Sequence, residues 1–308
     1  MSILSRRACR ARPILAAAAV AAAAALPAAP LPAQGAPARP RVVEEALRGS
    51  EDRELRWPVA VAAAPAGEIA VADAFGPRLV VFRKAGVGWQ AAAVAALPGA
   101  PAGLAWDGSR WVVAVRGEAS LVALEGDALL QRRLALPPGT VPGSLAAAAG
   151  GGLLVHDFAG GRILRLDAGG RPAGATAVTG RVTGLAAGPG GGAVAAFGDE
   201  GVVRRYDAAG GLEATWELPD DGPVPPWPAG VAVAPGGDTL VADRHNGRIV
   251  VFEAGGRVAG LGSRKGWDPG LLLFPGGLAL LPDGRLLVAD QGNGRLQVFR
   301  RSGEGAAR

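Results

Sequence analysis

The chain has 308 residues, of which 49% are hydrophobic, 19% charged and 5% aromatic, and it contains 49 glycines and 25 prolines. So much glycine and proline excludes an array of helical repeats, because both residues destabilise helix interiors. The formal net charge is +5, but no concentrated basic patch or aromatic platform accompanies it, so nucleic-acid binding is not indicated.

The first 33 residues predict a secretory signal peptide. Four arginines precede an alanine-rich apolar run, and small residues follow around Ala33 to Gly35. Cleavage near Ala33 would reduce the 32 basic residues to 28, against 27 acidic ones. The single cysteine, Cys9, lies before the apolar run, so a mature chain with neither lipid anchor nor disulfide is expected. We therefore predict a periplasmic or extracellular protein, with a short tether at 34–40 and no stable membrane anchor.

Residues 41–49 stand before the first of six repeated units. The chain that follows Phe299 is too short and glycine-rich to complete the last unit. We predict that 41–49 supplies the outer strand of that unit, which closes the ring and removes an exposed sheet edge. A short helix is the alternative, because Glu44 to Leu47 are good helix formers.

The six repeated units have anchor positions 40 to 47 residues apart. The clearest two read WPAGVAVAPGGDTLVADRHNGRIVVF and FPGGLALLPDGRLLVADQGNGRLQVF. Their alternating apolar residues and regular Gly and Pro-Gly punctuation are typical of short antiparallel strands. A period with room for about four strands is the size of one propeller blade. We predict an all-β, six-bladed β-propeller of four-stranded antiparallel blades, with blades at about 56–97, 98–139, 140–180, 181–219, 226–262 and 273–300 and a C-terminal tail at 301–308.

Four of the six units carry an aspartate and, five positions later, an arginine. The pairs are Asp73 with Arg78, Asp157 with Arg162, Asp243 with Arg248, and Asp290 with Arg295. The other two units have Val115 with Ser120 and Phe197 with Val202, so both residues are lost together. Across a four-residue hairpin turn the two side chains face each other, which predicts a structural pair that fixes the strand register. Calcium binding is the alternative, although Ca²⁺ needs several oxygen ligands in one place.

VADRHNGRIVVF and VADQGNGRLQVF resemble the closing strands of NHL-repeat proteins, and WPAGVAV and FPGGLAL resemble the family's opening turn. Gly247 and Gly294 stand where the family has a histidine. The resemblance implies a six-bladed propeller. The family includes scaffolds, sensor domains and a few enzymes, so the fold does not determine the function.

Enzymes on related propellers, such as lyases and lactonases, place metals and catalytic groups at the central channel. The predicted channel strands contain no ionisable residue, and the two histidines, His156 and His245, are too few for a three-histidine zinc site. No catalytic residue, metal or cofactor is therefore expected, and His156 is interpreted as a buried, hydrogen-bonded core residue. A lyase or lactonase-like enzyme with a metal at the channel stays open as the alternative.

The Asp–Arg turns and the links between blades are predicted to share one face, which also carries the longest loops. Aromatic and basic residues there are typical of recognition surfaces. We predict a monomeric, non-enzymatic module that binds a protein, peptide or glycan of the cell envelope on this face. The expected contact residues are Trp227, Arg244, His245, Asn246, Arg264, Lys265, Trp267, Gln291 and Asn293. In the alternative, Trp57, Trp227 and Phe274 pack on the prolines that follow them and fill gaps between blades.

Overall fold

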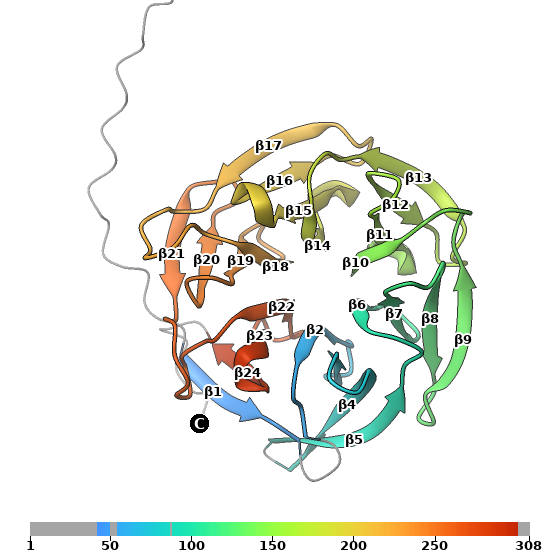
Figure 1. Ribbon diagram of the computed structural model, residues 1–308, viewed down its shortest axis with the longest axis horizontal. Coiled ribbons are helices and arrows are strands. Elements are labelled where there is room, and N and C mark those ends of the chain that lie inside the picture. Colours follow the sequence, from blue (N-terminus) through green and yellow to red (C-terminus); the bar gives the residue numbers. More distant parts are fainter. Residues whose placement is uncertain (1–41, 50–53, 87, 301–308) are drawn as a thin grey trace, which may run out of the picture. The chain divides into compact units, whose positions relative to one another are not determined.

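The computed structural model describes residues 42–49, 54–86 and 88–300. The predicted signal peptide, tether and tail, as well as Arg41, lie outside this part. The described chain forms six four-stranded antiparallel sheets arranged as blades around a central axis (Figure 1). The prediction of an all-β six-bladed propeller is therefore confirmed. Within the described residues, no helix is long and apolar enough to cross a membrane.

In blades one to five the strands pair in chain order from the channel outward, and in blade six the N-terminal β1 takes the outermost place. Blade one contains β2 (Pro58–Ala63), β3 (Ile69–Asp73), β4 (Arg78–Ala85) and β5 (Gly88–Ala96). Blade two contains β6 (Pro101–Trp106), β7 (Trp111–Val115), β8 (Ser120–Glu125) and β9 (Leu130–Ala135). Blade three contains β10 (Pro142–Ala147), β11 (Leu153–Asp157), β12 (Arg162–Leu166) and β13 (Pro172–Ala177).

The remaining blades repeat this order, with four short 3-10 turns in the described chain. Blade four contains β14 (Val182–Ala187), β15 (Ala193–Phe197), β16 (Val202–Tyr206) and β17 (Leu212–Glu217). Blade five contains β18 (Pro228–Val233), β19 (Thr239–Asp243), β20 (Arg248–Phe252) and β21 (Val258–Gly262). Blade six contains β22 (Pro275–Leu280), β23 (Leu286–Asp290), β24 (Arg295–Arg300) and β1 (Val42–Leu47). The turns are η2 (Ala149–Gly151), η3 (Pro189–Gly191), η4 (Gly198–Glu200) and η5 (Gln291–Asn293).

The hydrophobic core lies between adjacent blades rather than inside any one of them. On β7, Val113 and Val115 pack toward blade one, whereas Val112 and Ala114 pack toward blade three. Because both faces of a sheet are covered by neighbouring sheets, every residue of each second strand is buried. This double burial explains why these strands are mainly apolar, apart from the aspartates that end four of them, whereas the outer strands alternate.

The innermost strands approach one another closely around the channel. A side chain at Gly184 would lie 2.2 Å from the carbonyl oxygen of Ala229, and one at Gly230 would lie 2.2 Å from that of Gly276. Only glycine fits at such a backbone approach. These glycines let each first strand contact the first strand of the next blade, and they leave a channel wall with little side-chain bulk.

The N-terminal strand closes the ring, as predicted, and the alternative of a helix is wrong. β1 pairs antiparallel with β24, with Leu47 opposite Leu296. Leu47 is 6% exposed and belongs to the core cluster between blades six and one. Glu45 extends the contact by accepting a hydrogen bond from the amide of Trp89 in blade one. β1 therefore covers the edge that β24 would otherwise expose.

Candidate ligand-binding site at the mouth of the channel

The four Asp–Arg pairs are ion pairs across the hairpin between the second and third strands. In each blade that carries one, the two residues are direct register partners. The N–O distances lie between 2.8 and 3.1 Å. All four aspartates are at most 1% exposed. A buried carboxylate is costly unless every oxygen is hydrogen-bonded, so these pairs bear more on stability than exposed ion pairs would.

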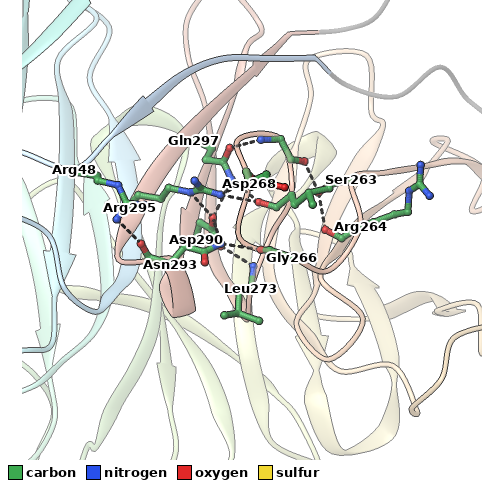
Figure 2. A network of polar contacts seen from close by, with 12 residues as sticks. Arg48, Ser263, Arg264, Gly266, Asp268, Leu273, Asp290, Asn293, Arg295 and Gln297 are labelled. Carbon is green, nitrogen blue, oxygen red and sulfur yellow. Dashed lines mark hydrogen bonds and ion pairs between the residues drawn. The ribbon is translucent and has the colours of Figure 1, made fainter.

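Figure 2 shows the network around Asp290. Its carboxylate accepts hydrogen bonds from Arg295, Asn293 and Gln297, each at 2.8 Å, and from the amide of Leu273 at 2.7 Å. Leu273 belongs to the connection that enters blade six. Equivalent amide bonds run from Trp57 to Asp73, Val141 to Asp157 and Trp227 to Asp243. Each aspartate thus ties a turn to the link entering the same blade.

Because each aspartate ties its turn to the link, two positions of the repeat meet at the mouth of the channel. One is the residue after the aspartate position, and the other is the residue just before the first strand. The first position contributes Arg116, Phe158, Arg244 and Gln291 to the lining of a central cavity. The second contributes Val141, Arg181 and Trp227.

The cavity has a volume of about 860 Å³ and occupies the half of the channel nearest the Asp–Arg turns. Its wall is built from the first strands of all six blades, with little side chain at Gly103, Gly184, Gly230 and Gly277. Among the described residues that line it, none is acidic. The cavity is therefore a bowl of backbone and small side chains whose ionisable groups are basic.

Three arginines from different blades supply that charge. Arg116 and Arg181 are exposed, and no ion pair links either of them to another described residue. Arg244 is half-buried and donates hydrogen bonds to the side chain of Gln291 and, at 3.3 Å, to the carbonyl oxygen of Phe274. Burial lowers the pKa of Arg244 from its ordinary value, yet a guanidinium keeps its charge at neutral pH.

An aromatic side chain stands beside these charges. The indole of Trp227 fills the space above Gly198, where a side chain would lie 2.6 Å from the ring. The imidazole of His245 lies 5.2 Å from the Trp227 ring, and its Nδ1 is 3.1 Å from the carbonyl oxygen of Pro225. With its amide held by Asp243, Trp227 presents a pre-positioned aromatic surface to the cavity.

His156 lines the same cavity from blade three, although it is only 3% exposed. A side chain at Gly143 would lie 2.8 Å from its Nδ1, so the imidazole takes the room that this glycine leaves. Phe158 contacts the ring edge-to-face at 6.2 Å. Burial lowers the pKa of His156 to about 4, against the opposing effect of the neighbouring Asp157 carboxylate. The side chain is therefore neutral at physiological pH.

The nine predicted contact residues fall into three groups: four line the cavity, two stabilise the Asp–Arg turns, and three lie in the long connection before blade six. Trp227, Arg244, His245 and Gln291 line the cavity. Asn246 instead supports its own turn, since its side-chain amide donates to Asp243 at 2.9 Å and to the carbonyl oxygen of Val224 at 3.1 Å. Asn293 has the same structural role beside Asp290.

The other three predicted residues lie in the long connection before blade six, outside the cavity lining. Lys265 donates to the carbonyl oxygen of His245 at 3.2 Å and lies 5.2 Å from the Phe274 ring. Trp267 is 74% exposed. In Figure 2 the side chain of Arg264 points away from the polar network. The long connection therefore borders the site without lining it.

Sequence reasoning missed Arg116, Phe158 and Arg181. Arg116 occupies the same repeat position as Arg244, and Arg181 the same position as Trp227. Aligning the repeats of blades two, three and four with that of blade five places all three at the mouth. The first strands contain no ionisable residue. Arg116, Phe158 and Arg181 lie instead in the turns and links around the mouth.

Fold and site together define a six-bladed β-propeller with a ligand-sized cavity at one end of its channel. The NHL repeat family matches residues 226–252 and 272–299, which are the repeats of blades five and six. The chain thus contains NHL repeats, as its sequence predicts. No curated protein matched the chain.

Solved structures share the architecture at low identity. A streptogramin B lyase is 11% identical, with a TM-score of 0.58 over 83% of this chain and 96% of its own. Virginiamycin B lyase from Staphylococcus aureus is 10% identical, with a TM-score of 0.58 over 83% and 98%. The WD40 β-propeller domain of Doa1 is 12% identical, with a TM-score of 0.59 over 85% and 97%. At these identities the likeness shows the fold alone.

Proposed function

We propose that this protein is an exported, non-catalytic binding module whose ligand occupies the cavity at the mouth of the channel. The observation that carries the proposal is the cavity itself, at about 860 Å³. Ligand pockets are concave, of roughly 300–1,000 Å³, with a few fixed polar groups on a mostly apolar wall. The wall of small residues and the rim of arginines match that description.

The shape of the site narrows the class of partner. A concave bowl suits a small molecule or the end of a peptide or glycan chain, whereas a flat protein surface would not reach its wall. Export is supported by the basic and alanine-rich segment over residues 1–33. The partner is therefore sought in the cell envelope or medium.

A substitution that fills the cavity tests this function. Ala229 lines the cavity on β18, so Ala229→Trp should occupy ligand space. The matched control is Leu212→Trp on β17, where Leu212 is 57% exposed. Immobilised wild type and the Leu212→Trp variant should retain the same molecules from envelope extract, and Ala229→Trp should lose them. Retention by Ala229→Trp would show that the ligand does not enter the cavity.

A propeller lyase is the second candidate function. It is favoured by the presence of both His156 and His245 in the cavity lining. Among the described residues, no group of three His, Cys, Asp or Glu side chains could hold a metal ion. Incubation with quinupristin, the compound bound in one of the similar lyase structures, followed by mass spectrometry and by metal analysis of the protein, distinguishes the candidates. An altered product or a stoichiometric metal would favour the lyase.

A further inference from the structure

The charge around the cavity is one-sided. Arg116, Arg181 and Arg244 are all in its lining, and no aspartate or glutamate is. Eleven other described arginines form ion pairs with acids, among them Arg110, Arg204 and Arg248. Within the described part of the chain, Arg116, Arg181 and Arg244 have no acidic partner. Three uncompensated cations around one concavity raise the local concentration of anions.

The arginines come from different directions. Arg116 follows β7 in blade two, Arg181 precedes β14 in blade four, and Arg244 follows β19 in blade five. These blades lie around the ring and do not form one edge of it (Figure 1). A single compact anion could pair with one guanidinium, but a ligand that meets several of them needs separate anionic groups.

The cavity also offers an apolar contact to the body of such a ligand. The indole of Trp227 packs against Gly198, and the ring of Phe158, 62% exposed, lines the cavity from blade three, two blades away from Arg244 in blade five. Aromatic faces beside guanidinium groups bind flat organic anions by stacking together with charge-assisted hydrogen bonds.

We infer that the cavity binds a small organic anion with at least two carboxylate or phosphate groups, which pair with Arg116, Arg181 and Arg244. This inference rests on the proposed binding function and names its ligand class. Arginine suits both groups, because its planar guanidinium donates two parallel hydrogen bonds to either. The half-buried Arg244, fixed by Gln291 and Phe274, is the most pre-organised of the three.

A matched pair of probes tests the inference by isothermal titration calorimetry on the full mature chain at low ionic strength. Benzene-1,3,5-tricarboxylate carries three anionic groups on a flat ring, and benzene-1,3,5-tricarboxamide has the same shape without charge. The tricarboxylate should bind at least about 10-fold more tightly than the tricarboxamide, since charge-assisted hydrogen bonds are the stronger kind. The same titration with tripolyphosphate, compared with that of the tricarboxylate, shows whether the cavity prefers phosphate or carboxylate groups.

Single substitutions test which arginines bind the tricarboxylate. Arg116→Ala and Arg181→Ala should each weaken tricarboxylate binding about 10-fold. Both side chains are exposed and unpaired among the described residues, so the fold should tolerate their loss. Arg264→Ala, which removes an arginine outside the cavity lining, should leave binding unchanged. Arg116→Lys should restore part of the affinity, because it keeps the charge.

Three results would overturn the inference: no binding of either anion, equal binding of the tricarboxamide, or an affinity that Arg116→Ala and Arg181→Ala leave intact. If the anions fail but Ala229→Trp still abolishes capture from envelope extract, the cavity remains the binding site and only the ligand class is wrong. If Ala229→Trp also has no effect on capture, the proposed function fails as well.

Discussion

His156 shows how one residue can depart from a repeat without disturbing it. The equivalent positions in the other five repeats are alanines, and a larger side chain fits here only because Gly143 leaves space beside it. The sequence identifies the departure but not its reason, since Gly143 lies 13 residues earlier on a different strand. The compensation becomes visible only when the hairpin is formed.

The buried imidazole should make stability depend on pH. Because the pKa of His156 falls to about 4 in the folded state, the unfolded chain binds the extra proton as pH drops through its usual value of about 6.5. Stability should therefore be fully present above pH 6.5 and should fall toward pH 4, by up to about 3 kcal/mol. Chemical denaturation between pH 4 and 7 should show this loss for wild type and a flatter profile for His156→Ala. Parallel profiles would contradict the assignment.

The Asp–Arg pairs should behave as coupled units. Asp243 is fully buried, and its carboxylate also holds the Trp227 amide and Asn246, so Asp243→Ala should cost about 3–5 kcal/mol. Arg248→Ala leaves the carboxylate unpaired and should also be costly. Asp243→Ala combined with Arg248→Ala should cost about 1–3 kcal/mol less than the sum of the single changes, measured by urea unfolding.

An exposed ion pair provides the control for this double-mutant cycle. Glu253 and Arg257 are bonded across a turn, but their side chains are 40% and 69% exposed. Their removal should change stability by less than about 1 kcal/mol, because solvent screens the pair. Additive costs at Asp243 and Arg248 would mean that the two residues do not act together.

Among the elements, β1 has the most distant partner in the chain. Its register with β24 joins residues more than 240 positions apart, such as Leu47 and Leu296. Counting the strands predicts this pairing, because the last repeat lacks an outer strand and one additional strand precedes the first repeat. Propensity alone would not, since Glu44 to Leu47 suit a helix. The requirement to cover an edge outweighs local preference.

The closing strand should contribute measurably to global stability. Leu47→Ala removes a side chain from the core between blades six and one and should cost about 2–4 kcal/mol, which lowers the Tm by several degrees. Leu130→Ala on β9, where the side chain is 69% exposed, should change stability by less than about 0.5 kcal/mol. A mature chain that lacks residues 41–49 should melt earlier still. Equal melting of this chain and the intact one would show that the ring does not depend on β1.

The long connection between β21 and β22 was harder to predict. Its length and its aromatic and basic residues suggest a recognition loop, yet Gly266 and Leu271 bond back to Asn293 and Arg295 of blade six. Within the connection, a short parallel bridge joins Lys265 and Leu272, and the Ser263 hydroxyl donates a hydrogen bond to the carbonyl oxygen of Gly270 at 2.8 Å. Such packing depends on backbone contacts that leave no periodic signal in the sequence.

At the scale of the whole molecule, the sequence repeat predicts the fold but does not predict the lining of the cavity. Blade number, strand number and ring closure all follow from the period and from strand counting. The cavity lining does not, because it collects single residues from five or six repeats that differ at the same position. Arg116 and Arg181 come from the two repeats without the Asp–Arg signature. These two repeats lack the most regular feature of the pattern, yet they carry two of the three cavity arginines.

The two faces of the propeller should respond differently to a ligand. The cavity reaches from the turns at 116–117, 158 and 244–245 down to Leu104, Leu185 and Val231 in the first strands, and it stops before the opposite face. A ligand held there should slow hydrogen exchange in those turns, because bound turns open less often. At 100 times its Kd the ligand should also stabilise the fold by about 2.7 kcal/mol.

Hydrogen–deuterium exchange, measured with and without bound benzene-1,3,5-tricarboxylate, compares the two faces directly. Peptides covering 116–117 and 244–245 should gain protection, while the turns 235–238 and 282–285 at the far ends of the first strands should not. Wild-type protein with the uncharged tricarboxamide at the same concentration, at which it should be mostly unbound, and the Ala229→Trp variant with the tricarboxylate should not gain this protection. Protection confined to 235–238 and 282–285 would place the working face at the opposite end of the channel, where the short turns lie.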